Sequence, residues 1–131
     1  GIGFIQGYGL KSGAVATSIS HDSHNIIVVG TNESDMAAAV NRVVDLNGGI
    51  VVWDGGASAA EVPLAIAGIM SDEPLEAVNE KLEAAKEKAH TLGVGQGIDP
   101  FMTLSFMALP VIPSLRITTR GVFDVNSQSY V

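Results

Sequence analysis

The sequence has 131 residues, of which 47% are hydrophobic and 16% charged, a composition typical of one globular domain rather than a disordered chain. The net charge of −7 excludes nucleic-acid binding through a basic surface, which needs Lys and Arg to neutralise phosphates. The absence of cysteine excludes disulfide scaffolds, zinc ribbons, thiolate nucleophiles and iron–sulfur sites.

The chain shows neither a signal peptide nor a membrane-spanning segment. It begins Gly1-Ile2-Gly3 without an initiator Met, which leads us to expect a piece of a longer protein or a processed chain. Its longest uncharged stretch, residues 100–115, is shorter than the roughly 20 residues that cross a bilayer, and Pro110 and Pro113 interrupt it. We therefore expect a soluble cytoplasmic protein with no membrane partner.

The first quarter of the chain predicts two strands. Residues 1–9 alternate glycine with apolar side chains and indicate an irregular or strand-like entry. Residues 14–20 alternate and contain β-branched side chains, and residues 25–31 form a continuous apolar run that predicts a strand buried on both faces. The polar residues 21–24 lie between these runs and predict a tight hairpin or a loop joining the two strands.

The middle of the chain predicts a helix followed by a strand pair. Asn32 or Ser34 can cap a helix over residues 35–46, which has one apolar face. Residues 50–53 then predict a buried strand. Residues 57–64 predict its partner, which Pro63 places at a sheet edge or a bulge.

The last part predicts the clearest helix, over residues 74–92, where apolar residues recur at helical spacing and Pro74 lies in the first turn. Residues 101–109 predict a short buried helix or turn that ends before Pro110, and residues 116–125 predict a strand or hairpin. The element order favours a layered α+β domain, with two main helices packed on a mixed or mostly antiparallel sheet.

The densest polar group is the run from Ser20 to Asn25. Two imidazoles and a carboxylate in one loop suit general acid–base work, which makes His21, Asp22 and His24 the candidate catalytic residues. A metal site needs three or four ligands, and the remaining histidine, His90, lies near the end of a separate helix, so no metal site is predicted. The alternative interpretation is a hydrogen-bonded turn in which Asp22 and Ser23 bond to their own backbone.

Other patterns favour structural roles. The glycines of residues 1–9 and 93–97 lack the strand–GxGxxG–helix context of a dinucleotide site, and no P-loop lysine follows them. Ser23 beside His24 has no recognisable oxyanion hole, which argues against a nucleophilic serine. The charge run of residues 76–88 indicates a solvated helix face, and the Met and Phe residues of 101–107 indicate core or interface.

Several segments resemble the C-terminal domain of bacterial and archaeal adenine deaminases, of the amidohydrolase superfamily. The most specific segments are HDSHNIIVVG (residues 21–30) and PFMTLSFMALPVIP (residues 100–113). The resemblance follows the order of the family along most of the chain: residues 1–41, GGIVV (residues 48–52), EVPLAIAGIMSDEP (residues 61–74) and residues 100–125. The resemblance implies an enzyme that hydrolyses adenine to hypoxanthine and ammonia in purine salvage. It also implies a preceding barrel that holds manganese or iron through His and carboxylate ligands.

The sequence lacks the barrel's metal-ligand motifs, so we expect no cofactor within these 131 residues. It also lacks the H-x-E and P-C-x-x-C pattern of zinc deaminases of the cytidine type. The resemblance thus implies a single domain, residues 1–131, that supports or completes an active site on another domain. In that interpretation His21, Asp22 or His24 contacts the purine or relays a proton, and Ser23 and Asn25 bind substrate.

Two alternatives remain open. A non-catalytic docking or oligomerisation module would pack the apolar segment 101–115 against the barrel or a second subunit, with the His-containing loop elsewhere. A regulatory domain would bind a purine in a closed pocket of its own. A catalytic contribution instead predicts that His21 and His24 line a concave surface. The expected partners are adenine, the preceding barrel and a second copy of the chain.

Overall fold

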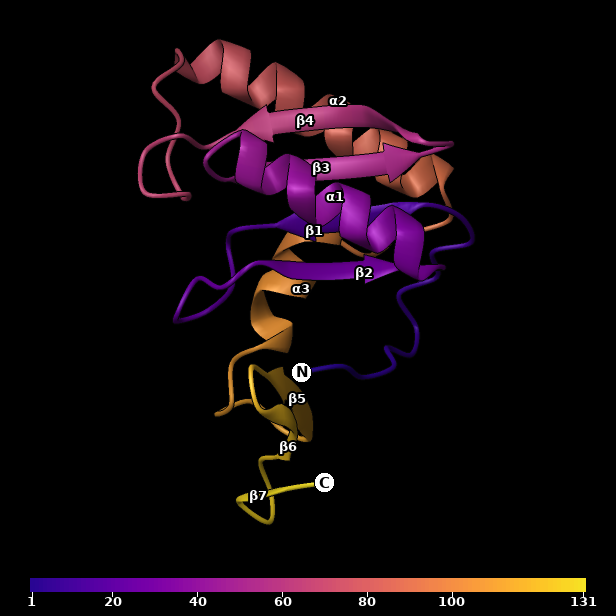
Figure 1. Ribbon diagram of the computed structural model, residues 1–131, viewed down its shortest axis with the longest axis vertical. Helices are drawn as coiled ribbons and strands as arrows, with labels where there is room; N and C mark the ends of the chain where they lie inside the picture. The colour runs from indigo at the N-terminus through magenta and orange to yellow at the C-terminus, as the bar shows by residue number, and fades with distance from the viewer.

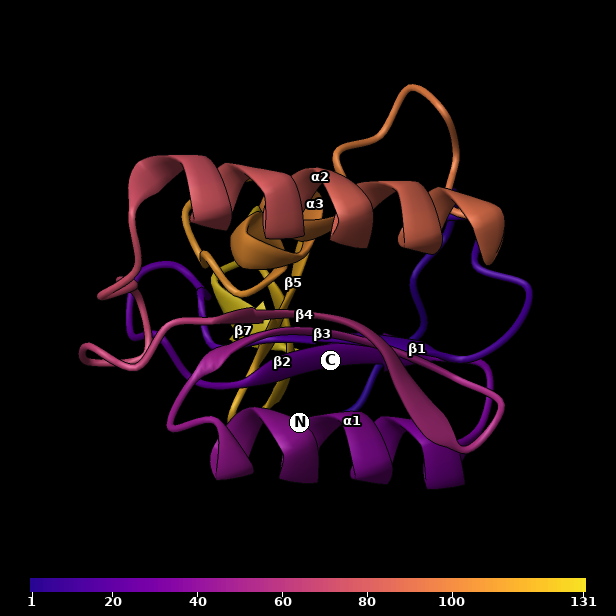
Figure 2. The same cartoon turned by 90° about the horizontal axis from the view of Figure 1, so that it is seen from above.

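The computed structural model describes residues 1–131, and its main body has three layers (Figures 1 and 2). A four-stranded sheet forms the middle layer. Helix α1 (Glu33–Asp45) covers one face of this sheet, while α2 (Leu75–Thr91) and α3 (Pro100–Met107) cover the other (Figure 2). The predicted α+β class, with helices layered on a sheet, is confirmed.

The sheet consists of β1 (Ala14–Thr17), β2 (Ile27–Gly30), β3 (Gly49–Asp54) and β4 (Ala57–Pro63) in the order β2-β1-β3-β4. Every neighbouring pair is antiparallel. Because β2 and β3 both run opposite to β1, they run in the same direction, and α1 connects them across one face. The loops that leave β1 and β4 and those that enter β2 and β3 therefore gather at one end of the sheet (Figure 1).

Strand β1 is the centre of the core, since all four of its residues are buried. Val15 packs with Ile50 and Val52 of β3 in the cluster that α2 and α3 cover. Ala14 and Ala16 point to the other face, where they meet the α1 residues Ala39 and Val43. The small alanines let the helix approach the sheet closely, as the dense packing of protein interiors requires.

The expectation that residues 25–31 are buried on both faces is wrong. Strand β2 is an edge strand, and its four residues are only half-buried because the helices cover the sheet incompletely at that edge. The other edge agrees with the prediction, since β4 ends at Pro63, where a missing N–H costs no ladder bond.

The helix ends follow from their capping residues. The Asn32 side chain accepts a hydrogen bond from the Asp35 N–H at 2.9 Å and caps α1, so Asn32 rather than Ser34 is the cap. Helix α2 begins directly after Pro74 and buries Ala85 and Ala89. The segment predicted as a short helix or turn is helix α3, which buries Phe101 and Leu104.

Asp99 caps α3, because its carboxylate accepts hydrogen bonds from the N–H groups of Phe101 and Met102 at 3.1 and 2.9 Å. Burial opposes ionisation of Asp99, but the bond from Met102 and the nearby charge of Lys86 outweigh it, so the Asp99 pKa lies below its usual value. The cap fixes the start of the helix that contacts the loop between β1 and β2.

A second, small sheet lies outside the three-layer body (Figure 1, yellow). It consists of β5 (Leu115–Thr118), β6 (Gly121–Asp124) and β7 (Ser129–Tyr130), all antiparallel. Residues 1–9 form no strand, although Tyr8 is buried and its hydroxyl donates to the Pro100 carbonyl at 3.1 Å. No helix combines the length and apolar character needed to cross a bilayer.

Candidate functional site

The candidate site is the loop of residues 18–26, which joins β1 to β2 at the end of the sheet. The His21 N–H donates to the Ser105 carbonyl of α3 at 2.8 Å, and the His24 N–H donates to the Ser20 carbonyl at 2.6 Å. Ser20 is buried, so the loop is anchored at its base. These bonds confirm a loop joining two strands and place it against α3.

The two histidine rings lie together on α3. The His21 ring stacks on the Phe106 ring with centroids 4.9 Å apart, and the His24 ring meets His21 edge-on at 5.5 Å. The His24 Nδ1 accepts from the Ser20 N–H at 3.4 Å, so the neutral ring carries its proton on Nε2. Neither ring nitrogen of His21 makes a hydrogen bond, which leaves both free for other partners.

A surface hollow of about 290 Å³ lies beside this loop, between β2, the end of α3 and strand β5. Three of the predicted site residues line it: Asp22, Ser23 and Asn25. His21 and His24 are not among its lining residues, so the expectation that both histidines line a concave surface is not met at this hollow. The structure separates the loop into a histidine pair on α3 and a polar group at the hollow. The full lining is Gly1, Ser20, Asp22, Ser23, Asn25, Ile26, Ile27, Val28, Ala108, Pro110, Ile117, Thr118 and Thr119.

The polar group is arranged to bind. The Asn25 Nδ2 donates to the Ser23 Oγ at 2.9 Å, which leaves the Ser23 hydroxyl proton free to donate and the Asn25 carbonyl oxygen free to accept. The Asp22 carboxylate adds an acceptor. Apolar side chains such as those of Ile26, Val28 and Ile117 also belong to the lining. A concave surface that combines apolar side chains with polar groups can hold a small ligand.

The residues present do not fit a metal centre. No group of three or more His, Cys, Asp or Glu side chains is close enough to hold a metal ion. The histidine pair with Asp22 does not form such a group, and His90 lies on α2. No reaction step is therefore assigned to a metal held by this domain.

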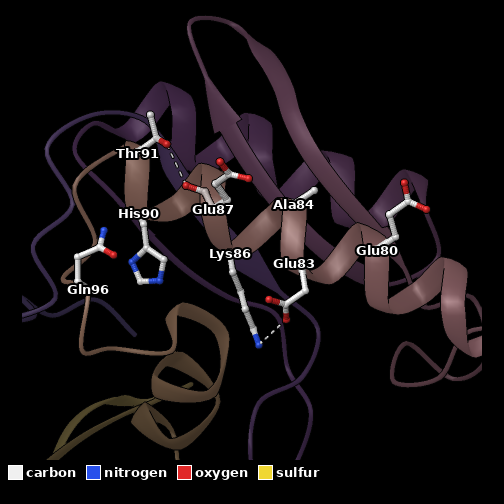
Figure 3. A pocket seen from close by; sticks show the side chains of 8 residues that line it. All are labelled: Glu80, Glu83, Ala84, Lys86, Glu87, His90, Thr91 and Gln96. Carbon is white, nitrogen blue, oxygen red and sulfur yellow. Dashed lines mark hydrogen bonds and ion pairs between the residues drawn. The ribbon is translucent and has the colours of Figure 1, made fainter.

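A second, larger hollow of about 690 Å³ lies on the outer side of α2 (Figure 3). Some of its side chains already have partners: Lys86 pairs with Glu83 at 3.1 Å and with Asp99 at 3.4 Å, and the His90 Nδ1 donates to the Val94 carbonyl at 3.0 Å. Half of its lining residues are charged, which agrees with the solvated helix face predicted for residues 76–88. Its lining residues are Glu80, Glu83, Ala84, Lys86, Glu87, His90, Thr91 and Gln96.

Sequence reasoning missed the part of α3 that holds the loop. The Met and Phe residues of 101–107, Phe106 among them, indicate core or interface, and no role is predicted for Ser105. In the structure the Phe106 ring stacks on the His21 ring, and the Ser105 carbonyl accepts a hydrogen bond from the His21 amide. No local sequence pattern predicts that Thr118 and Thr119 line the hollow. These residues lie more than 80 positions away from the loop in the sequence, and a local pattern does not report contacts over that separation.

One part of the arrangement expected for a docking module through segment 101–115 differs in the structure. That interpretation places the His-containing loop elsewhere, whereas the loop lies directly on α3. Phe101 and Leu104 are buried inside the domain, and the exposed large apolar side chains of the segment are Met102, Val111 and Leu115.

Comparison with known proteins agrees with the resemblance. The family model of the adenine deaminase C-terminal domain matches residues 1–129. The adenine deaminase of Bacillus subtilis (strain 168) is 50% identical over 131 residues, and that of Desulfatibacillum aliphaticivorans is 51% identical over 131 residues; each match covers 100% of this chain and 23% of the relative. The adenine deaminase of Methylobacterium nodulans is 52% identical over 126 residues, 96% of this chain and 22% of the relative.

The match covers almost the whole chain, at an identity that leaves no doubt about common descent. The chain spans less than a quarter of the length of these relatives. It belongs to the adenine deaminase C-terminal domain family.

Proposed function

We propose that residues 1–131 form a single C-terminal domain of an adenine deaminase, the enzyme that converts adenine and water to hypoxanthine and ammonia. The proposal is supported by the family match and by relatives that carry this name and are about half identical to the chain. The enzyme acts in purine salvage in the cytoplasm, as the resemblance implies.

We further propose that the loop of residues 18–26 completes the active site. The observation that carries this role is the hollow, whose lining combines Asp22, Ser23 and Asn25 with apolar side chains. Adenine matches this lining, because it has flat apolar faces and an edge of ring nitrogens and an amino group. A free Ser23 donor and free Asp22 and Asn25 acceptors complement that edge.

The reaction requires proton movement that the histidine pair can supply. Water adds its oxygen to C6 of adenine, and one of its protons passes to ring N1 while the other passes to the exocyclic nitrogen. The bond from C6 to that nitrogen breaks, ammonia leaves, and C6 is left as the carbonyl of hypoxanthine. The His24 Nε2–H and the free nitrogens of His21 can donate or accept protons, and they belong to the same loop as Asp22, Ser23 and Asn25, which line the hollow. The backbone of Ser20 and the ring of Phe106 hold these imidazoles in place.

The domain works with the rest of the polypeptide in this proposal. Manganese or iron would be held by the preceding domain, because no metal cluster fits within residues 1–131. The preceding barrel is then the domain's partner within the chain, and a second copy of the chain is the expected partner between chains.

The test is ammonia release from adenine with added manganese, measured on the 131-residue domain and on the full-length polypeptide. Circular dichroism of the domain alone serves as the control that it is folded. We expect activity from the full-length polypeptide and none from the domain. Activity from the domain alone would show that the chemistry resides within residues 1–131, and an inactive, metal-loaded full-length polypeptide would overturn the assignment.

A further inference from the structure

Residues 1–5 present an apolar face to solvent beside the small C-terminal sheet. The side chain of Ile2 is 91% exposed and that of Phe4 is 106% exposed, the two highest values among large apolar residues of the chain. Removing large apolar side chains from water is favourable, so leaving two of them fully exposed is unfavourable. We therefore expect another surface to cover Ile2 and Phe4.

The opposite face of the same segment is fixed on the hairpin of β5 and β6. A Cβ placed on Gly1 would lie 2.2 Å from the Thr118 carbonyl oxygen and 2.8 Å from the Gly121 Cα, so no side chain fits there. A Cβ on Gly3 would lie 3.2 Å from the Val122 Cγ2. The Gly1 nitrogen also donates to the Thr119 carbonyl at 3.2 Å.

The alternation of glycine and apolar residues in residues 1–4 therefore has a structural reason. Gly1 and Gly3 let the backbone lie against the hairpin, and Ile2 and Phe4 extend from the other side of an extended segment. The exposed pair is thus presented by a supported segment. Tyr8, whose hydroxyl binds the Pro100 carbonyl, anchors the same segment to the start of α3.

We infer that Ile2 and Phe4 dock on the domain that precedes this one in adenine deaminases. The family is a C-terminal domain, and the chain covers only 23% of relatives such as that of Bacillus subtilis, so most of the polypeptide lies before it. In such a relative, the part that precedes the C-terminal domain is the largest body available to cover the pair.

The docking inference rests on the proposed function, because it needs a domain that precedes this one in the full-length enzyme. It does not need the loop of residues 18–26 to take part in catalysis, since Ile2 and Phe4 are not lining residues of the hollow.

The experiment compares cysteine accessibility in the full-length polypeptide. Phe4→Cys is the test variant, and Val44→Cys, on the exposed side of α1 at 59% exposure, is the matched control. Each is labelled with a maleimide, and the labelled peptide is quantified by mass spectrometry and normalised to its rate in denaturant. We expect Phe4→Cys to react at least tenfold more slowly than Val44→Cys in the native protein. Equal normalised rates would overturn the inference.

Two further measurements separate the remaining outcomes. Hydroxyl-radical oxidation of the unsubstituted full-length protein reports Phe4 directly, and protection of Phe4 is expected even if a cysteine variant folds poorly. Labelling is repeated across a dilution series that dissociates oligomers. Protection that persists in the monomer supports the preceding domain as the occupant, whereas protection lost on dilution assigns the surface to a second copy and overturns the inference.

Discussion

The His21 imidazole lies stacked on the Phe106 ring, with centroids 4.9 Å apart and planes 25° from parallel. One residue away, the Ser105 carbonyl accepts the His21 backbone N–H at 2.8 Å. Side chain and backbone of His21 are thus both held by α3. The position of the polar loop between β1 and β2 consequently depends on a helix that lies about 80 residues further along the chain.

Phe106→Ala removes the ring that supports His21. Aromatic pairs of this kind contribute about 0.5–1.5 kcal/mol beyond burial, and a loss of this size in orienting His21 lowers kcat/KM for adenine by up to about tenfold. The measurement is steady-state kinetics on the full-length enzyme. Phe106→Tyr keeps the ring and is expected to retain activity.

Phe106 acts through His21 in this interpretation, which a double-mutant cycle tests. In a His21→Asn background, Phe106→Ala is expected to cause no further loss of kcat/KM beyond its effect on stability. Additive losses from the two substitutions would show that Phe106 supports the fold without positioning the imidazole.

Asp99→Asn tests the cap of α3 through pH. Asp99 has a pKa below its ordinary value of 3.8, so the ionised carboxylate stabilises the fold above that value and the stabilisation is lost as pH falls through the folded-state pKa. Asn caps helices as well as Asp but does not titrate. Because the Asp99 side chain is 42% exposed, solvent screening limits the effect to less than about 1 kcal/mol.

The measurement for Asp99 is urea unfolding of the 131-residue domain at pH 7 and pH 3. The unsubstituted domain is expected to lose more stability between these pH values than Asp99→Asn. An identical loss in both would mean that the charge of Asp99 does not stabilise α3.

Ser18→Ala removes a buried hydroxyl that joins three loops at the end of the sheet. The Ser18 Oγ accepts from the Gly49 N–H at 2.8 Å and also donates to the Gly68 carbonyl. Leaving these buried groups without a partner costs about 1–3 kcal/mol, which chemical denaturation of the domain measures. Ser34→Ala, at an exposed position of α1, is the control and is expected to change the unfolding free energy by less than about 0.5 kcal/mol.

Ala67→Gly is expected to stabilise the domain. Ala67 has a φ of +56°, a left-handed conformation that costs a residue with a Cβ about 1–2 kcal/mol, and glycine adopts it freely. The larger entropy of glycine in the unfolded state offsets part of this gain, leaving a net increase of up to about 1 kcal/mol. The same substitution in the exposed helical position Ala37 is expected to destabilise by about 1 kcal/mol. Thermal unfolding of both variants shows whether the two signs differ.

The sequence alone was sufficient for the elements whose signals are local. The capping side chain of Asn32, the apolar spacing along α2 and Pro63 at the end of β4 each act within a few residues, and the structure agrees with all three. The burial of β2 was misjudged because the run of apolar residues from Asn25 to Thr31 does not report its place in the sheet. Strand order depends on contacts between distant segments.

The candidate loop was recognised for the same local reason, since polar residues interrupt two apolar runs. The sequence did not predict that the loop divides into a histidine pair and a polar group at the hollow. That division depends on Phe106 and Thr118, which approach the loop from other parts of the fold. Local pattern was therefore enough to propose the loop residues as candidates, while their neighbours in space required the structure.

The most direct test of the loop's part in deamination is kcat/KM for adenine in the full-length, metal-loaded enzyme carrying His21→Asn and His24→Asn. His90→Asn is the matched control, because His90 lies on α2 and binds the Val94 carbonyl away from the loop. Acid–base groups typically contribute 10²–10⁴-fold, so the double variant is expected to lose at least about 100-fold and the control less than about threefold. Unchanged kcat/KM in a folded, metal-loaded double variant would show that the loop has no part in catalysis.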